Sequence, residues 1–208
     1  MSQPGQIVIL NGAPRSGKSS IAAAIQETFD GVWMNRGVDV HVRHIRPPRY
    51  RPGIGLRPGS DRPEVAALVP TLYAALYDSI PAHTRLGLNV VAYVGHSQAA
   101  PGSGGVLTDC ARRLAGLPVL FVGVRCPLEF IMQRRIAGQA GRETDYLRGL
   151  PTEPIPEPVR RWQVEVHIPG VYDLEVDTSK LRPAQCAVLI LERLSVEGPG
   201  QTAFEHLA

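Results

Sequence analysis

The chain has 208 residues, and its mixture of 44% hydrophobic and 20% charged residues is typical of a folded globular protein rather than a disordered one. Its formal net charge of only +3 argues against nucleic-acid binding driven by bulk electrostatics. No apolar stretch approaches the length of a membrane span, and a strand-like run begins by residue 6, so we expect neither a membrane segment nor a signal peptide.

Short strand-like runs alternate with helical segments along the chain, which is typical of a parallel sheet built from βαβ units. The expected strands are 6–11, 32–34, 88–94, 119–124 and 173–176. The expected helices are 17–29, 64–86, 106–115, 127–137 and 183–195. These elements predict one α/β domain over residues 1–208 with a five-stranded parallel sheet flanked by helices.

The segments between these elements differ in composition. Residues 43–63 are rich in arginine, proline and glycine and are expected to form a loop. We expect Pro70 and Pro81 to interrupt or kink the helix over 64–86. Residues 138–158 are polar and then proline-rich, so they are expected to be irregular and to serve as a lid. The tail from about residue 197 is expected to be frayed.

A phosphate-binding loop follows the first predicted strand. Residues 12–19 match the pattern G-x-x-x-x-G-K-[ST] between a strand and a helix, which is the context that this motif requires. Lys18 supplies a charge for the β- and γ-phosphates of a nucleoside triphosphate, and Ser19 supplies a hydroxyl for Mg²⁺. The expected nucleotide contacts are Gly12, Ala13, Pro14, Arg15, Ser16, Gly17, Lys18, Ser19 and Ser20.

Catalytic candidates follow other strands of the sheet. Asp39 comes just after the second strand, and the carboxyl ends of parallel strands converge on one crevice. It could accept a proton from an attacking hydroxyl group, or it could merely cap the next helix. Arg134 and Arg142 flank a glycine-containing segment and could stabilise a transferring phosphate. The alternative is that they are solvated residues at a helix end.

Several ordered segments resemble a known family. They are Ile9-Leu10-Asn11-Gly12 with the phosphate-binding loop, Trp33, Gly37-Val38-Asp39, Val122-Gly123-Val124-Arg125-Cys126-Pro127, Val166-His167 and Tyr172-Asp173-Leu174-Glu175-Val176-Asp177-Thr178-Ser179. Together they resemble the chloramphenicol phosphotransferases, which are P-loop small-molecule kinases with a nucleoside-monophosphate-kinase-like core. The resemblance covers most of the chain.

The resemblance implies a reaction. Members of the family use Mg²⁺ and transfer the γ-phosphate of ATP to a hydroxyl group of a small molecule. Asp39 matches the position of the base, Lys18 and Ser19 match the phosphate and metal contacts, and Thr178 lies where the adenine packs. The acceptor would be chloramphenicol or another hydroxylated antibiotic or metabolite, which suggests a role in antibiotic resistance.

This chain departs from the family pattern in two places. Tyr93 or Val94 stands where the third strand is expected to carry an acidic residue, so metal binding would rest on Ser19 and the phosphates, with Asp39 as a further candidate. His96 follows in a turn and is expected to be solvated. The lid also lacks the family's arginine–glycine–aspartate–arginine run around Arg142.

Alternatives remain open at this stage. A nucleoside or nucleotide kinase could have the same core, and the missing acidic residue is also compatible with a non-catalytic nucleotide-binding regulatory protein. The arginines of residues 43–62 could recognise an anionic acceptor, although solvation of a surface loop is the slightly favoured interpretation. The three widely spaced cysteines, Cys110, Cys126 and Cys186, predict free buried thiols and a cytoplasmic protein. The sequence does not identify the acceptor or the oligomeric state.

Overall fold

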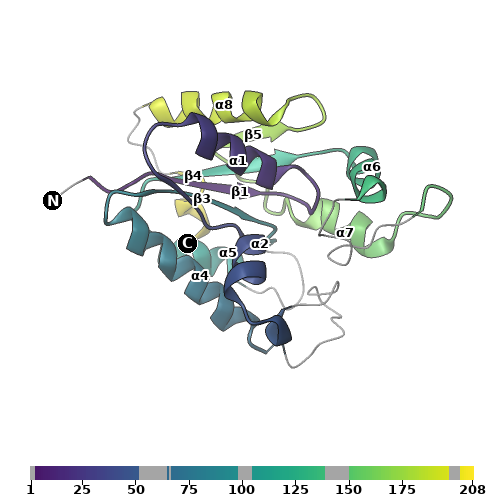
Figure 1. Ribbon diagram of the computed structural model, residues 1–208, viewed down its shortest axis with the longest axis horizontal. Helices are drawn as coiled ribbons and strands as arrows, with labels where there is room; N and C mark the ends of the chain where they lie inside the picture. Colours follow the sequence, from purple (N-terminus) through teal and green to yellow (C-terminus); the bar gives the residue numbers. More distant parts are fainter. Residues whose placement is uncertain (1–2, 52–64, 66, 98–104, 139–149, 197–201) are drawn as a thin grey trace.

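The computed structural model describes residues 3–51, 65, 67–97, 105–138, 150–196 and 202–208 (Figure 1). Its strands are β1 (Ile7–Asn11), β2 (Trp33–Asn35), β3 (Asn89–Val94), β4 (Val119–Arg125) and β5 (Leu174–Asp177). All are parallel and form one sheet in the order β2-β3-β1-β4-β5. The predicted five-stranded parallel sheet is therefore confirmed.

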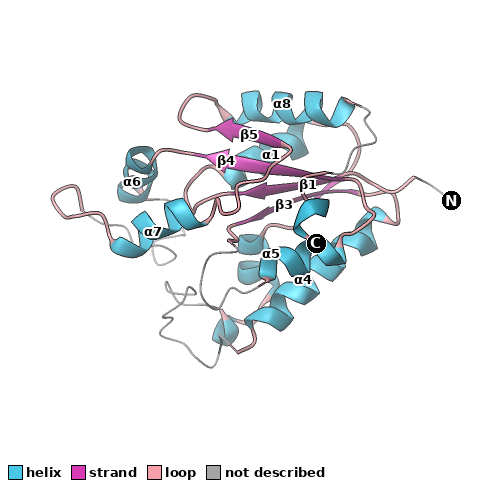
Figure 2. Ribbon diagram, turned by 180° about the vertical axis from the view of Figure 1, so that it is seen from behind, coloured by secondary structure: helices cyan, strands magenta, loops and turns pink. Residues whose placement is uncertain are grey.

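Helices cover both faces of this sheet and its carboxyl edge. The helices are α1 (Lys18–Thr28), α2 (Val38–Val40), α4 (Val69–Thr84), α5 (Val106–Arg113), α6 (Leu128–Ala137), α7 (Glu157–Glu165) and α8 (Pro183–Ser195). Figure 1 shows α1 and α8 on one face and α4 and α5 on the other. Figure 2 shows α6 and α7 beyond the end of the sheet to which β4 and β5 point. That end is where ligands bind in open α/β sheets.

Successive residues of the central strand β1 enter two different cores. Val8 and Leu10 pack with α1 and α8, whereas Ile7 and Ile9 pack with α4 and α5. Side chains alternate across a strand, so a strand that is covered on both faces must be apolar throughout. This is why β1 reads as an uninterrupted apolar run and why the loop that follows it has a rigid support.

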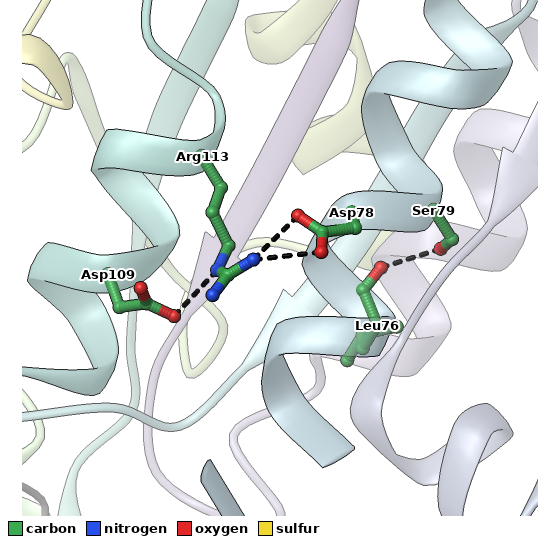
Figure 3. Close-up of polar contacts among 5 residues, drawn as sticks. All are labelled: Leu76, Asp78, Ser79, Asp109 and Arg113. Carbon is green, nitrogen blue, oxygen red and sulfur yellow. Dashed lines mark hydrogen bonds and ion pairs between the residues drawn. The ribbon is translucent and has the colours of Figure 1, made fainter. Parts of the chain in front are cut away.

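The helices α4 and α5 are also joined at the surface by an arginine (Figure 3). The Arg113 guanidinium donates to both carboxylate oxygens of Asp78 at 2.8 Å and to Asp109 at 2.8 Å. Exposed ion pairs add little stability individually. The buried apolar contacts between the two helices, including Leu76 and Leu107, are the main source of their association.

The two prolines do not interrupt α4 as we expected. Pro70 lies in the first turn, where its missing N–H has no helical partner to lose. Pro81 lies inside the helix, which nevertheless continues to Thr84. In the expected loop, a π-helical turn η1 spans His41–Ile45 and a 3-10 turn η2 spans Pro48–Tyr50. The part of that loop over 52–63 lies outside the described residues.

One helix was not predicted and one further expectation is wrong. The expected irregular segment ended at residue 158, but α7 begins at Glu157, with Pro158 in its first turn and with Val159 and Trp162 buried. The tail is not frayed over 202–208, where the 3-10 turn η3 spans Glu205–Leu207. Phe204 is only 2% exposed, and its ring centre lies 5.1 Å from that of Phe121. Apolar burial therefore holds this end of the chain on the sheet.

The expectation for the cysteines is confirmed. All three cysteines are buried and free, as expected. Within the described part of the chain, no helix combines the length and apolar character that crossing a bilayer requires.

Candidate active site

The loop between β1 and α1 has two glycines that are needed for different reasons. Gly17 has a φ of +98° at the start of α1, a left-handed conformation that glycine adopts without strain. A Cβ at Gly12 would lie 2.5 Å from the carbonyl oxygen of Val124. No described side chain caps α1 and its first turn has no acidic residue, so its first backbone N–H groups are available to an anion.

The polar side chains of this loop match that geometry. The Lys18 ammonium group donates to the carbonyl oxygens of Gly12 at 2.8 Å and Ala13 at 2.9 Å, which holds the charge over the loop. The Ser16 hydroxyl is buried and has no hydrogen-bond partner among the residues that the structure describes. An ammonium group, an unpaired buried hydroxyl and a row of N–H groups together fit a polyphosphate ligand.

The metal expectation depends on Ser19, which lies in the first turn of α1. No group of three or more His, Cys, Asp or Glu side chains that could hold a metal ion occurs in the described ranges. Tyr93 and Val94 are both buried in the cores of the sheet, so β3 supplies no carboxylate at its end. The donor set therefore fits a Mg²⁺ ion held by Ser19 together with nucleotide phosphates, a common arrangement in kinases.

Asp39 lies in the first turn of α2, two residues after a glycine that packs against β3. A Cβ at Gly37 would lie 2.1 Å from the Tyr93 ring, so only glycine allows this close approach. Tyr93 pairs in register with Leu10 of β1. Gly37 therefore places the half-buried Asp39 at the carboxyl edge of the sheet, near β3, which is the neighbour of β1. Its catalytic role stays a prediction.

Arg134 and Thr178 meet at the phosphate-binding loop. Arg134 donates to the carbonyl oxygen of Arg15 at 3.3 Å and to the Thr178 hydroxyl and carbonyl oxygens at 3.1 and 2.7 Å. Thr178 in turn donates to the carbonyl oxygen of Ser16 at 2.7 Å. The Arg15 side chain donates back to the carbonyl oxygen of Arg134 and, at 2.9 Å, to that of Gly138.

Arg134 was expected on a segment that closes over the phosphate, but these hydrogen bonds fix its side chain beside the phosphate-binding loop. Its guanidinium is used to join the phosphate-binding loop, the end of α6 and the turn after β5. Whether it also neutralises charge during phosphate transfer stays a prediction. Arg142 lies outside the described residues.

A hydrogen-bonded network that we did not predict lies beneath the loop. The Asn11 amide donates to the carbonyl oxygens of His96 at 3.1 Å and Val166 at 2.9 Å and to the Tyr172 hydroxyl at 3.1 Å. That hydroxyl is 2.8 Å from Nδ1 of His167. The signal available in the sequence was a polar residue, Asn11, at the end of an otherwise apolar strand. Its partners are more than 80 residues away, and their approach depends on the fold.

His96 is buried rather than solvated, so the sequence expectation was wrong. Its Nε2 is hydrogen bonded to the Tyr77 hydroxyl, and its backbone N–H donates to the side chain of Asn11 at 3.0 Å. Burial, followed by the nearby charge of Lys18, lowers the pKa of His96 to about 3. A neutral imidazole therefore lies close to Lys18 without adding to its positive charge.

A family model described as chloramphenicol phosphotransferase-like protein matches residues 5–195. The chain belongs to the chloramphenicol phosphotransferase-like family. A search of curated proteins finds no match. The family match includes every predicted site residue, from Gly12 to Thr178.

Solved structures extend this result to the fold. A shikimate kinase from Acinetobacter baumannii in complex with shikimate has a TM-score of 0.55 and 14% identity, over 91% of this chain and 93% of that chain. The APS kinase of Mycobacterium tuberculosis in complex with AMPPNP and APS has a TM-score of 0.57 and 15% identity, over 94% and 100%. A sugar kinase from Janibacter has a TM-score of 0.59 and 16% identity, over 99% of both chains. This member of the chloramphenicol phosphotransferase-like family therefore has a P-loop kinase fold.

Proposed function

We propose that this protein is an ATP-dependent O-phosphotransferase that moves the γ-phosphate to a hydroxyl group of a small molecule. Family and fold together support an ATP-dependent kinase of the P-loop type. The observation that carries the proposal is the loop at residues 12–19, where Lys18 lies over the backbone and Ser16 has an unpaired hydroxyl. Such a loop binds the β- and γ-phosphates of ATP.

In the proposed reaction, Asp39 orients the acceptor hydroxyl group and accepts its proton. The hydroxyl oxygen forms a bond to the γ-phosphorus as the bond to the β,γ-bridging oxygen breaks, and that oxygen leaves with ADP. Lys18 neutralises charge that builds on the phosphate oxygens. Mg²⁺, held by Ser19 and the phosphates, supplies further charge neutralisation when bound.

The other predicted residues are given supporting roles. Arg134 positions the phosphate-binding loop through the carbonyl oxygen of Arg15. Thr178 is placed beside the loop and is proposed to contact the nucleotide on its adenine side. Arg142 is proposed to close on the transferring phosphate. Candidates for the acceptor are chloramphenicol or another hydroxylated antibiotic or metabolite, and the named substrates of the similar folds, such as shikimate, support a small molecule.

One observation favours a second function. Because Tyr93 is buried where an acidic residue was expected, the protein could bind ATP as a regulator without transferring phosphate. A nucleoside or nucleotide kinase is the remaining enzymatic alternative. Identifying which acceptor is phosphorylated distinguishes it from the proposed function.

A γ-labelled ATP transfer assay with Mg²⁺ tests the proposal. The wild type, Asp39→Asn and a control, Asp30→Asn, would be compared on a panel containing chloramphenicol, nucleosides and other hydroxylated antibiotics and metabolites; Asp30 is exposed after α1. We expect a labelled product from the wild type and the control, and a transfer rate lower by about 10²- to 10⁴-fold for Asp39→Asn because a general base is lost. ATP binding without any labelled product would support the regulatory function. Equal rates for Asp39→Asn and the wild type would exclude Asp39 as the base.

A further inference from the structure

An arginine on the acceptor side of the site is buried without a counter-ion. Arg46 follows the π-helical turn η1 and is only 4% exposed. Among the described residues, its Nε and Nη1 atoms have no hydrogen-bond partner and no carboxylate forms an ion pair with it. The slightly favoured expectation that the arginines of this loop are solvated is therefore wrong for Arg46.

The ionisable side chains near Arg46 include a second arginine and a histidine, which do not neutralise its charge. The pKa of His41 is lowered by burial and then by the charges of Arg46 and Arg36, so both guanidinium groups are near enough to affect this ring. Burial also lowers the pKa of Arg46, which Tyr73 partly opposes. A buried charge is costly unless it is paired, so this cluster favours an anionic partner.

Two aromatic residues, Tyr73 and His96, relate Arg46 to the phosphate-binding loop. Tyr73 of α4 is near enough to Arg46 to affect its pKa, and the Tyr73 ring centre lies 4.8 Å from that of His96 in an edge-to-face arrangement. The ring of His96 is in turn close enough to Lys18 to have its pKa lowered by that charge. Arg46 also lies seven residues after Asp39, and Figure 1 shows the segment after α2 beside α4. It is therefore placed on the side of the site where the acceptor would bind.

The hydrogen bonds that Arg46 makes within the described residues use its backbone. The backbone N–H of Arg46 donates to the carbonyl oxygen of His41 at 3.0 Å, and its carbonyl oxygen accepts from Arg51 at 3.4 Å. The guanidinium group contributes to neither hydrogen bond. Among the described residues, no hydrogen bond of Nε or Nη1 supports a purely structural requirement for arginine at this position.

We infer that Arg46 binds an oxyanion group of the acceptor, which makes the substrate an anionic hydroxylated small molecule carrying a carboxylate, phosphate or sulfate. The guanidinium has two buried donors without a hydrogen-bond partner among the described residues, Nε and Nη1. They lie on different edges of its plane, so each can donate separately to an oxygen of such a group. This inference rests on the proposed function and narrows its substrate class. Neutral chloramphenicol would leave the charge of Arg46 unpaired.

Binding of simple anions tests the site independently of phosphate transfer. With the phosphate-binding loop occupied by AMPPNP and Mg²⁺, sulfate, inorganic phosphate and acetate would be titrated while the ¹⁵N resonance of Arg46 Nε is followed. Thermal stabilisation would be measured in parallel for the wild type, Arg46→Met and Arg49→Met. Arg49 is a matched control, because it is exposed and stacks over Tyr50, 4.9 Å from the ring centre. We expect saturable binding in the wild type and in Arg49→Met and its loss in Arg46→Met.

The same titration can overturn the inference. No saturable binding by the wild type, or equal binding by Arg46→Met, would exclude an oxyanion site at Arg46. If Arg46→Met is unfolded, as judged by its unfolding transition, Arg46→Lys takes its place. Lysine keeps the charge but has a single donor nitrogen in place of the guanidinium, so we expect about 10-fold weaker binding.

Pairs of charged and neutral acceptors test whether the anion site at Arg46 contributes to phosphate transfer. Each hydroxylated acid in the transfer assay is paired with its neutral methyl ester or phosphate triester. We expect kcat/KM to be about 10- to 100-fold higher for the anionic member, and this preference to vanish in Arg46→Met. Equal transfer to both members would refute the inference and leave the kinase proposal intact. Anion binding at Arg46 without transfer to any acceptor would refute the kinase proposal instead and leave the anion site standing.

Discussion

Arg134 has contacts that suggest a second role beside the expected one at the transferring phosphate. Its guanidinium is hydrogen bonded to the carbonyl oxygen of Arg15 and to Thr178 on two different elements. A side chain tied in this way is suited to holding the phosphate-binding loop in shape for ATP. This role and that of a lid arginine predict different kinetics.

We predict that Arg134→Met raises the KM for ATP about 10-fold and changes kcat only a few-fold, because it removes a support of the binding loop rather than a contact made only in the transition state. Steady-state kinetics with saturating acceptor would measure both constants. Gln133→Ala, on the exposed side of α6, is the control and should change neither. If kcat instead fell by about 10³-fold or more while KM stayed unchanged, Arg134 would act at the transferring phosphate.

At the scale of elements, the approach of α2 to β3 decides where Asp39 lies. Gly37 directly precedes α2 and lies close to the ring of Tyr93. A larger residue would push the helix away from the sheet and move the carboxylate with it.

We predict that Gly37→Ala lowers the free energy of unfolding by about 1–3 kcal/mol through overpacking, because its Cβ would lie 2.1 Å from the Tyr93 ring. The phosphotransfer rate should fall by about 10-fold or more, since small displacements of a catalytic group are costly. Urea unfolding and the transfer assay would measure the two effects. Adding Tyr93→Leu should recover part of both losses. If Gly37→Ala alone matches the wild type, the close packing does not position Asp39.

At the scale of the whole molecule, the C-terminal segment completes the core on the face covered by α4 and α5. Phe204 and Leu207 are buried there, although they lie beyond the last helix. The stability of the sheet should therefore depend on residues that the sequence suggested were frayed.

We predict that Phe204→Ala lowers the free energy of unfolding by about 3 kcal/mol, the lower end of the cost of removing a buried phenylalanine. Leu191→Ala in α8, at a side chain that is 45% exposed, is the control and should cost less than about 1 kcal/mol. Chemical denaturation would compare the two variants. A loss below about 0.5 kcal/mol for Phe204→Ala would mean that the tail adds little to the core.

Buried histidines make the stability of the molecule depend on pH. The pKa of His96 is lowered to about 3 by burial and the charge of Lys18, and that of His167 to about 4 by burial and the charge of Arg125. Both rings stay neutral in the folded protein near neutral pH, whereas their pKa is 6.5 in the unfolded chain. Below pH 6.5 the unfolded state binds more protons, so acidification favours unfolding.

We predict that the free energy of unfolding falls as the pH is lowered from about 6.5 towards 4, by up to about 1.4 kcal/mol per pH unit for each histidine. Urea unfolding at pH values of about 7.5, 6.5, 5.5 and 5 would measure this slope above the range in which carboxylates titrate. His167→Gln should reduce the slope, and exposed His206→Gln should leave it unchanged. Stability independent of pH over this range would contradict the burial of neutral rings.

The sequence by itself determined the parallel sheet and the phosphate-binding loop, because both depend on neighbouring residues. Apolar runs such as Ile7–Leu10 predict buried strands, and the spacing from Gly12 to Ser19 defines the loop. Their positions are confirmed to within a residue or two, and the family match supports the kinase class.

The tertiary structure decided the features that depend on distant contacts. Arg134 meets Arg15 across 119 positions, Asn11 meets Val166 across 155, and Phe204 reaches the sheet only after a segment that looked frayed. Burial of Arg46 and His96 is decided in the same way, by the helices packed around them rather than by their neighbours in sequence. A local pattern records which side chains are available, but whether a charge is solvated, paired or left for a ligand depends on what the fold brings against it.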